Sequence, residues 1–246
     1  MSDNIIYSKD GAVASIRFNR PQKKNAITGA MYQAMADALE DAAASPEVRA
    51  LGIFGGDVFT AGNDIADFLS AGGFDETHPV LRFLYAIRDF QKPVIAGVKG
   101  PAIGIGTTLL MHCDAVVAGT SARFSLPFTK LGIVPEAGSS VLLPLIAGRM
   151  RASWYLLSGE QFDAHHASDM GLVTRVTEDG DVDGAVAMMC GELAELPPNA
   201  VATTKRLMKA PFADLVAKAM DEETKLFAAA LTSDEARAAF MKFLQR

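Results

Sequence analysis

The segments Phe59-Thr60-Ala61-Gly62-Asn63-Asp64 and Pro101-Ala102-Ile103-Gly104-Ile105-Gly106 decide the fold that the sequence predicts. Each follows a short apolar run typical of a buried strand, Ala50–Phe54 or Pro93–Val98, and each leads into a helical pattern. Small residues in both segments let a ligand approach the backbone closely. Two helix starts that face one point could stabilise a negative charge on an oxygen, because the first N–H groups of a helix have no partner within it. Ordinary turns between a strand and a helix would explain the same pattern.

Outward from these segments, the pattern predicts an α/β protein. Ile5–Ser8 and Val13–Phe18 are expected to be strands, and Thr28 is a candidate N-cap for the helix that follows. Strand, helix and strand recur with short links, which favours parallel pairing. From about Glu192 onward the pattern is helical, so we predict a core over residues 1–195 and a helical C-terminal region over residues 196–246.

The composition narrows the kind of partner. The chain has 246 residues and a formal net charge of −6, with no basic block, which argues against a nucleic-acid partner. No apolar run is long enough to span a membrane and no signal peptide is visible, so a soluble cytoplasmic protein is expected. The histidines have no metal-ligand spacing. Gly104-x-Gly106 only half-fits a dinucleotide fingerprint, so no nucleotide cofactor is expected.

The two segments are similar to known ones. Phe59–Ile65 resembles the stretch that carries the first oxyanion N–H in the enoyl-CoA hydratase/isomerase (crotonase) family, and Gly100–Gly106 resembles the stretch that carries the second. Asn19-Arg20-Pro21 and Leu157-Ser158-Gly159-Glu160 resemble further landmarks of the family. The similarity extends from about residue 5 to residue 244. It implies a crotonase-like spiral of ββα units, with a helical C-terminal region that assembles trimers or dimers of trimers.

The resemblance also implies a site. The thioester carbonyl of an acyl-CoA would lie between the backbone N–H groups of Ala61 and Ile105. Coenzyme A is part of that substrate, so no separate cofactor is expected. Contacts with the acyl-CoA are expected, besides these two residues, from Lys23, Gly62, Asn63, Asp64, Ile65, Gly104, Phe128 and Lys242. Lys24 and Lys92 are further candidates for the CoA phosphates. Solvated lysines, and a turn or N-cap role for Asp64, remain alternatives.

One acid distinguishes the reaction. Hydratases of the family use two glutamates, whereas this chain has Thr108 and Phe128 at the corresponding positions. Glu136 stands where hydratases commonly have glycine. The sequence around it resembles the equivalent stretch of Δ3,Δ2-enoyl-CoA isomerases, and Asn63 in the first segment resembles the same subgroup. Moving a double bond from C3 to C2 needs one base that reaches both C2 and C4. The resemblance therefore predicts a 3-enoyl-CoA isomerase of fatty-acid β-oxidation. The alternatives are hydration, another CoA-thioester reaction, or a non-catalytic acyl-CoA binder in which Glu136 is only a first-turn helix acid.

Several other side chains are assigned structural or electrostatic roles. A helix that begins near Ala137 would lower the pKa of Glu136, while apolar neighbours would raise it. His112 is expected to be a satisfied buried histidine, and Trp154 is expected in the core. The two cysteines, Cys113 and Cys190, are expected to be free buried thiols.

Overall fold

A computed structural model describes residues 3–70 and 78–244, and for residues 68–70 and 243–244 it describes the backbone alone. Its larger sheet has the strand order β1-β2-β3-β4-β6-β9, in which β1 is antiparallel to β2 and the other pairs are parallel. The strands are β1 (Ile5–Asp10), β2 (Val13–Phe18), β3 (Ala50–Phe54), β4 (Val94–Val98), β6 (Ala115–Gly119) and β9 (Arg175–Thr177). The predicted α/β class and parallel pairing are confirmed.

A smaller sheet lies beside the second predicted segment. Its order is β5-β7-β8, with β5 at Pro101–Ile103, β7 at Arg123–Ser125 and β8 at Phe162–Asp163. Because β4 and β5 are separated by only two residues, the chain passes from the larger sheet to the smaller one at Lys99-Gly100. Gly100 has φ +59 and lies against the Asp57 carbonyl, so a Cβ there would meet backbone.

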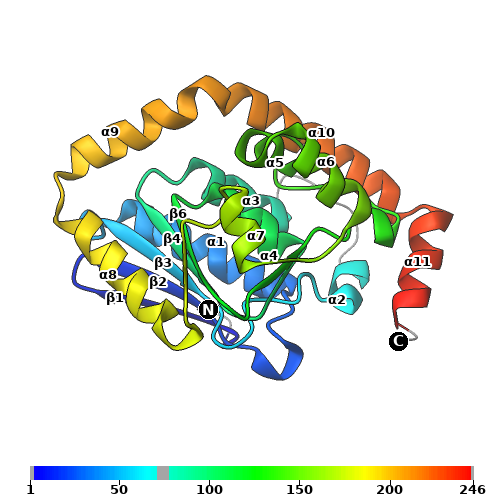
Figure 1. Cartoon of the computed structure of the whole chain (residues 1–246), viewed down its shortest axis with the longest axis horizontal. Coiled ribbons are helices and arrows are strands. Elements are labelled where there is room, and N and C mark those ends of the chain that lie inside the picture. Colours follow the sequence, from blue (N-terminus) through cyan, green and yellow to red (C-terminus); the bar gives the residue numbers. More distant parts are fainter. Residues whose placement is uncertain (1–2, 71–77, 245–246) are drawn as a thin grey trace.

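Helices cover both faces of the larger sheet (Figure 1). On one side, α1 (Gly29–Ala44) packs against α3 (Pro79–Asp89) and places an apolar face in the main core. Thr28 caps α1 as predicted, since its side chain accepts a hydrogen bond from Met31 N. On the other side, α8 (Val182–Glu195) packs against β3, β4 and β6. The helical part therefore begins at residue 182, earlier than the sequence pattern predicted.

The elements around the second segment are short. The helix α4 (Ile105–Thr108) is followed by the 3-10 helix η2 (Leu109–His112). Further along are the 3-10 helix η3 (Thr129–Leu131), α5 (Ser139–Ala147), α6 (Arg149–Ser158) and α7 (Ala164–Asp169). The first segment leads into α2 (Ile65–Ser70). The composition of Ser70–Pro79 predicts a loop, and most of this stretch lies outside the described residues.

The C-terminal helices arch over the core (Figure 1). They are α9 (Pro198–Lys209), α10 (Ala213–Leu231) and α11 (Asp234–Leu244). Lys205 connects α9 to the core. Its side chain is 4% exposed, and its ammonium group donates to Asp114 Oδ2 at 2.6 Å and to the Lys92 carbonyl at 2.7 Å. The division at residue 195 stays a prediction. Within the described part of the chain, no helix combines the length and the apolar composition that crossing a membrane requires.

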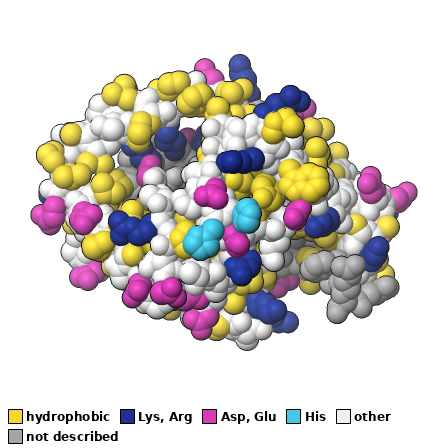
Figure 2. All heavy atoms as spheres, in the orientation of Figure 1, with side chains coloured by type: hydrophobic (Ala, Val, Ile, Leu, Met, Phe, Trp, Pro, Cys, Tyr) yellow, Lys and Arg dark blue, Asp and Glu magenta, His cyan; other side chains and the backbone are white. Residues whose placement is uncertain are grey.

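The prediction that Trp154 packs in the core is wrong. Its side chain lies on the outer surface of α6 and is 58% exposed, and its indole N–H donates to Glu160 Oε2 at 2.6 Å. Exposed apolar side chains gather along α9 and over α6 (Figure 2). Among them are Met150, Leu157, Leu207 and Met208. Exposed apolar patches of this kind mark interaction surfaces.

Candidate active site

The first segment is held by short backbone pairings. Ile27 N donates to the Gly62 carbonyl at 2.8 Å, and Asp64 N donates to the Ile27 carbonyl at 2.9 Å. Ala61 N donates to the Lys24 carbonyl at 2.9 Å. Gly62 makes this path possible, because its φ is +91 and a Cβ there would lie 2.9 Å from the Ile103 carbonyl oxygen.

These pairings correct one prediction. Ala61 is not the first oxyanion donor, because its N–H is already used by Lys24. Two residues on, the Asn63 N–H has no acceptor among the described residues. The parallel bridge to Ile27 uses the Gly62 carbonyl and the Asp64 amide, so the Asn63 amide is directed away from it. The sequence could not show which of these alternating amides faces inward.

The second segment presents the other donor. Gly104, with φ +56, precedes α4, and its carbonyl accepts from Thr107 N and Thr108 N at 2.8 and 3.0 Å. Ile105 is the first residue of α4, so its N–H has no partner within the helix, and no other described residue accepts it. Asn63 and Ile105 line the same cavity, which agrees with two amides acting at one place.

This cavity has a volume of about 530 Å³ and lies between the two segments, η3 and α11. Predicted contact residues in its lining are Ala61, Gly62, Asn63, Ile65, Gly104, Ile105, Phe128 and Lys242. Phe240, which in the sequence accompanies Lys242 at a position resembling a CoA contact of the family, lines it too. Lys130 and Phe227 also line it, although the sequence did not point to them. Lys130 lies two residues after Phe128, whereas Phe227 comes from a C-terminal helix whose placement the sequence does not reveal.

Lys23 and Asp64 do not belong to that lining. Asp64 accepts hydrogen bonds from the Arg20 guanidinium at 2.8 Å and from Asp67 N at 3.3 Å, and Arg20 holds its pKa below the usual range. Two roles were considered for Asp64, contact with the acyl-CoA and a place in a turn or cap, and these hydrogen bonds support the second. Lys92 is directed elsewhere, because its ammonium group donates to the Ala42 and Ser45 carbonyls at 2.6 and 2.7 Å.

Glu136 lies in a narrower space of about 30 Å³ that adjoins the cavity, since Asn63 and Phe227 line both. The rest of its lining consists of Tyr32, Val80, Leu81, Leu84 and Thr224. Among the described residues that line the two spaces, Glu136 is the only acid. The Thr108 hydroxyl donates to Glu136 Oε1, and the Tyr32 hydroxyl donates to Asn63 Oδ1 at 2.6 Å. The side chains of Glu136 and Asn63 are thus both held by buried hydroxyl groups.

Burial decides the protonation of Glu136. It raises the pKa of this carboxyl to about 8, against a lowering by the Thr108 hydroxyl and a further rise from the nearby Glu223. A carboxyl whose pKa is close to neutral can both accept and return a proton under ordinary conditions. Burial is therefore the largest influence on this pKa, and it exceeds the opposing effect of the Thr108 hydroxyl.

Comparisons with known proteins agree with this geometry. The family described as enoyl-CoA hydratase/isomerase matches residues 8–246. The chain belongs to this family. It is similar to enoyl-CoA delta isomerase 2 of Rattus norvegicus, with 38% identity over 100% of this chain and 64% of the relative, so the chain spans somewhat less than two thirds of that protein. It is also 30% identical to the 2,3-dehydroadipyl-CoA hydratase of Escherichia coli, over 98% of this chain and 96% of the relative.

A solved structure gives the same result for the fold. OdaA of Pseudomonas aeruginosa is 43% identical over the whole of both chains, with a TM-score of 0.97. The predicted crotonase-like fold and membership of a family of enzymes are thereby confirmed. Because the family includes both isomerases and hydratases, the residues around Glu136 must distinguish the reaction.

Another acid occupies the amides at the start of α5. Ala137 and Gly138 have φ +59 and +73, and the helix begins at Ser139, two residues after Ala137. The N–H groups of Gly138 and Ser140 donate to the Glu223 carboxylate at 2.6 and 2.9 Å. Glu223, on α10, thus occupies the position at the helix start that would have stabilised an ionised Glu136.

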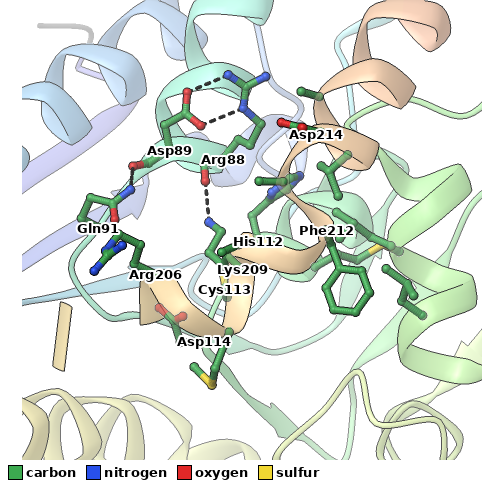
Figure 3. Close-up of a pocket in the computed structure, with 18 of the residues that line it drawn as sticks. Arg88, Asp89, Gln91, His112, Cys113, Asp114, Arg206, Lys209, Phe212 and Asp214 are labelled. Atoms are coloured by element: carbon green, nitrogen blue, oxygen red, sulfur yellow. Dashed lines mark hydrogen bonds and ion pairs between the residues drawn. The ribbon is translucent and has the colours of Figure 1, made fainter. Parts of the chain in front are cut away.

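A second cavity, of about 620 Å³, lies under α9 (Figure 3). There the Lys209 ammonium group donates to the Arg88 carbonyl, and Arg88 forms an ion pair with Asp89 at 2.7 Å. His112 borders this cavity and is satisfied as predicted, with Nε2 2.8 Å from the Ala137 carbonyl; burial lowers its pKa to about 4. Neither of the two segments that line the first cavity borders this space.

Cys113 and Cys190 are free thiols as predicted, but only Cys190 is buried and Cys113 is partly exposed.

Proposed function

We propose that the chain converts 3-enoyl-CoA thioesters to 2-trans-enoyl-CoA thioesters. The observation that carries the proposal is the carboxyl of Glu136, with a pKa of about 8, which is the only acid among the described residues that line the cavity of the Asn63 and Ile105 amides and the space adjoining it. Similarity to an enoyl-CoA delta isomerase supports the same reaction.

The proton balance needs only this carboxyl. The Glu136 carboxylate removes a proton from C2, and the electron pair of that C–H bond delocalises over C2 to C4 and the thioester oxygen. The Asn63 and Ile105 N–H groups donate to that oxygen and stabilise the dienolate. The protonated Glu136 then gives the same proton to C4, which leaves the double bond between C2 and C3 and restores the carboxylate.

The remaining lining suits the rest of an acyl-CoA. Lys242 is exposed at the mouth of the cavity, where its ammonium group can meet a phosphate. Val80, Leu81 and Leu84 of α3 offer an apolar wall to the acyl chain. We also propose that the chain assembles as a homotrimer or dimer of trimers, which the exposed apolar side chains of α6 and α9 support. The proposed reaction would serve the β-oxidation of unsaturated chains.

The test is direct. Purified protein should convert 3-hexenoyl-CoA to 2-hexenoyl-CoA, as followed by chromatography of the thioesters. Glu136→Gln, which keeps the size of the side chain, should lose at least about a hundredfold in kcat, because it removes the proton carrier of the proposed mechanism. Glu222→Gln, at an exposed position of α10, is the matched control and should keep the activity. Full activity of Glu136→Gln would remove Glu136 from the mechanism.

Hydration is the second candidate, because the E. coli hydratase is also similar. Thr108 and Phe128 stand at the positions of the two hydratase glutamates. Neither side chain can act as a base, and the Thr108 hydroxyl donates a hydrogen bond to Glu136. We therefore expect hydration of 2-hexenoyl-CoA to be far slower than isomerisation. Binding of acyl-CoA with turnover of neither substrate would favour a non-catalytic binder.

A further inference from the structure

Glu223 is an acid buried without a cation. It is 6% exposed, and no lysine or arginine within the described residues forms an ion pair with it. Burying a carboxylate is costly unless hydrogen bonds compensate. Its two oxygens accept from Gly138 N and Ser140 N, so the first amides of α5 supply that compensation.

The turn that these amides belong to carries Glu136. Ser139 N and Ser139 Oγ both donate to the Glu136 carbonyl, at 3.1 and 2.6 Å. On the other side, His112 Nε2 lies 2.8 Å from the Ala137 carbonyl. Residues 136–140 are therefore held between η2 and α10, and Glu223 provides the contact from α10.

A helix start attracts one negative charge strongly. Without Glu223, the nearest acid to these amides in sequence would be Glu136 itself. Because Glu223 already occupies them, Glu136 is left to the apolar space beside Val80, Leu81 and Leu84 and to the Thr108 hydroxyl. Two nearby carboxyls also disfavour each other's ionisation.

We propose that Glu223 is a positioning residue: it holds the 136–140 turn and occupies the amides at the start of α5, so that Glu136 faces the space lined by Val80, Leu81 and Leu84 and carries the proton there. This inference rests on the proposed function for its catalytic meaning. It assigns to α10 a part in the chemistry besides the predicted part in assembly.

The order of ionisation follows from the contacts. Burial raises the pKa of Glu223, while hydrogen bonds from Ser140 and from Gly138 N lower it. Because Glu223 accepts two backbone N–H bonds whereas Glu136 accepts one hydroxyl, we expect Glu223 to ionise first and Glu136 second. The other titratable groups that face this region are Tyr32 of α1 and His112 of η2. Burial raises the pKa of Tyr32 well above its ordinary value and lowers that of His112 to about 4, so both stay neutral between pH 5 and 9. The walls from α3 are apolar.

The experiment measures the ionisation of Glu136 without substrate. In the full-length protein with glutamate ¹³C-labelled at the carboxyl carbon, the Glu136 resonance is identified by its loss in Glu136→Gln. In Glu223→Gln we expect its midpoint to fall by about one pH unit, a tenfold change in the ionisation constant. The lower limb of the kcat profile for 3-hexenoyl-CoA should move equally, whereas Glu222→Gln should move neither. A merely structural role would lower activity at every pH and leave both midpoints in place.

Two further results keep the inference testable. Glu223→Asp keeps the charge, so the Glu136 midpoint should stay high; a fall of about one unit there would refute the electrostatic role, even where Glu223→Gln fails to fold. In the unmodified protein, an observed ionisation of Glu136 before Glu223 would refute it as well. If the midpoint moves as expected but no enoyl-CoA is isomerised, the proposed function fails and the positioning role of Glu223 stands.

Discussion

Replacing Glu136 by Gln should change how the stability of the protein depends on pH. Burial raises the pKa of this carboxyl from 4.5 to about 8, so the folded state holds its proton where the unfolded state has lost it. Since the folded state then binds more protons, the free energy of unfolding falls as pH rises from 4.5 through 8. Gln cannot ionise, so the variant lacks this loss.

The magnitude follows from the two pKa values. Each unit between them corresponds to about 1.4 kcal/mol, and between pH 5.5 and pH 8 the contribution of Glu136 to unfolding falls by about 3 kcal/mol. Glu136→Gln should therefore gain about 3 kcal/mol relative to the unmodified protein over that interval. The Thr108 hydroxyl can still donate to the Gln oxygen, so the local contact survives the change.

Urea unfolding at both pH values, at one protein concentration, measures this difference. Glu222→Gln is the matched control, since it makes the same chemical change at an exposed position of the same helix that carries Glu223, and its difference from the unmodified protein should vary little with pH. Parallel pH profiles for Glu136→Gln and the unmodified protein would mean that Glu136 ionises near its ordinary value. The argument from burial would then be wrong.

Three other changes test neighbouring parts of the site and fold. Thr108→Val removes a donor that favours ionised Glu136, so the midpoint of the kcat profile should move to higher pH; an unmoved midpoint would contradict the hydrogen bond. Gly62→Ala forces a Cβ to 2.9 Å from the Ile103 oxygen at φ +91 and should cost about 2 kcal/mol and most of the activity, whereas Gly184→Ala, in open space on α8, should stabilise by about 0.5 kcal/mol in urea unfolding. Lys205→Met leaves Asp114 without its cation and should cost about 2 kcal/mol by the same measurement, with equal stability excluding a role for the pair.

Much of the fold could be predicted from local pattern. The bounds of β2 and β3 and the cap at Thr28 agree with the prediction, because apolar alternation and a hydroxyl before a helix act over a few residues. The start of α5 could not be predicted in this way. Two successive residues with positive φ delay it to Ser139, and only one of them is a glycine.

The donor at the first segment shows a second limit. Ala61 and Asn63 differ by two residues, and the pattern of small residues includes both. The register of the bridge to Ile27 decides between them, and the Lys24 carbonyl takes the Ala61 amide. Neither partner is near the segment in sequence. The exposed Trp154 is a similar case, since a large aromatic side chain may serve a core or an interface and its sequence neighbours do not distinguish them.

The sequence did not point to Glu223, because its role depends on a hydrogen bond from Gly138 N, which lies 85 residues earlier in the chain. Its effect explains how one carboxyl can suffice where hydratases of the family use two. A single group that both removes and returns a proton must be able to hold it between the two steps, and a carboxyl at its ordinary pKa of 4.5 holds it weakly at neutral pH. Burial alone would favour the protonated form, but a free helix start beside Glu136 would oppose it. By placing another acid on that helix start, the fold lets burial act on Glu136 with no opposition from the helix start, and only the Thr108 hydroxyl opposes it.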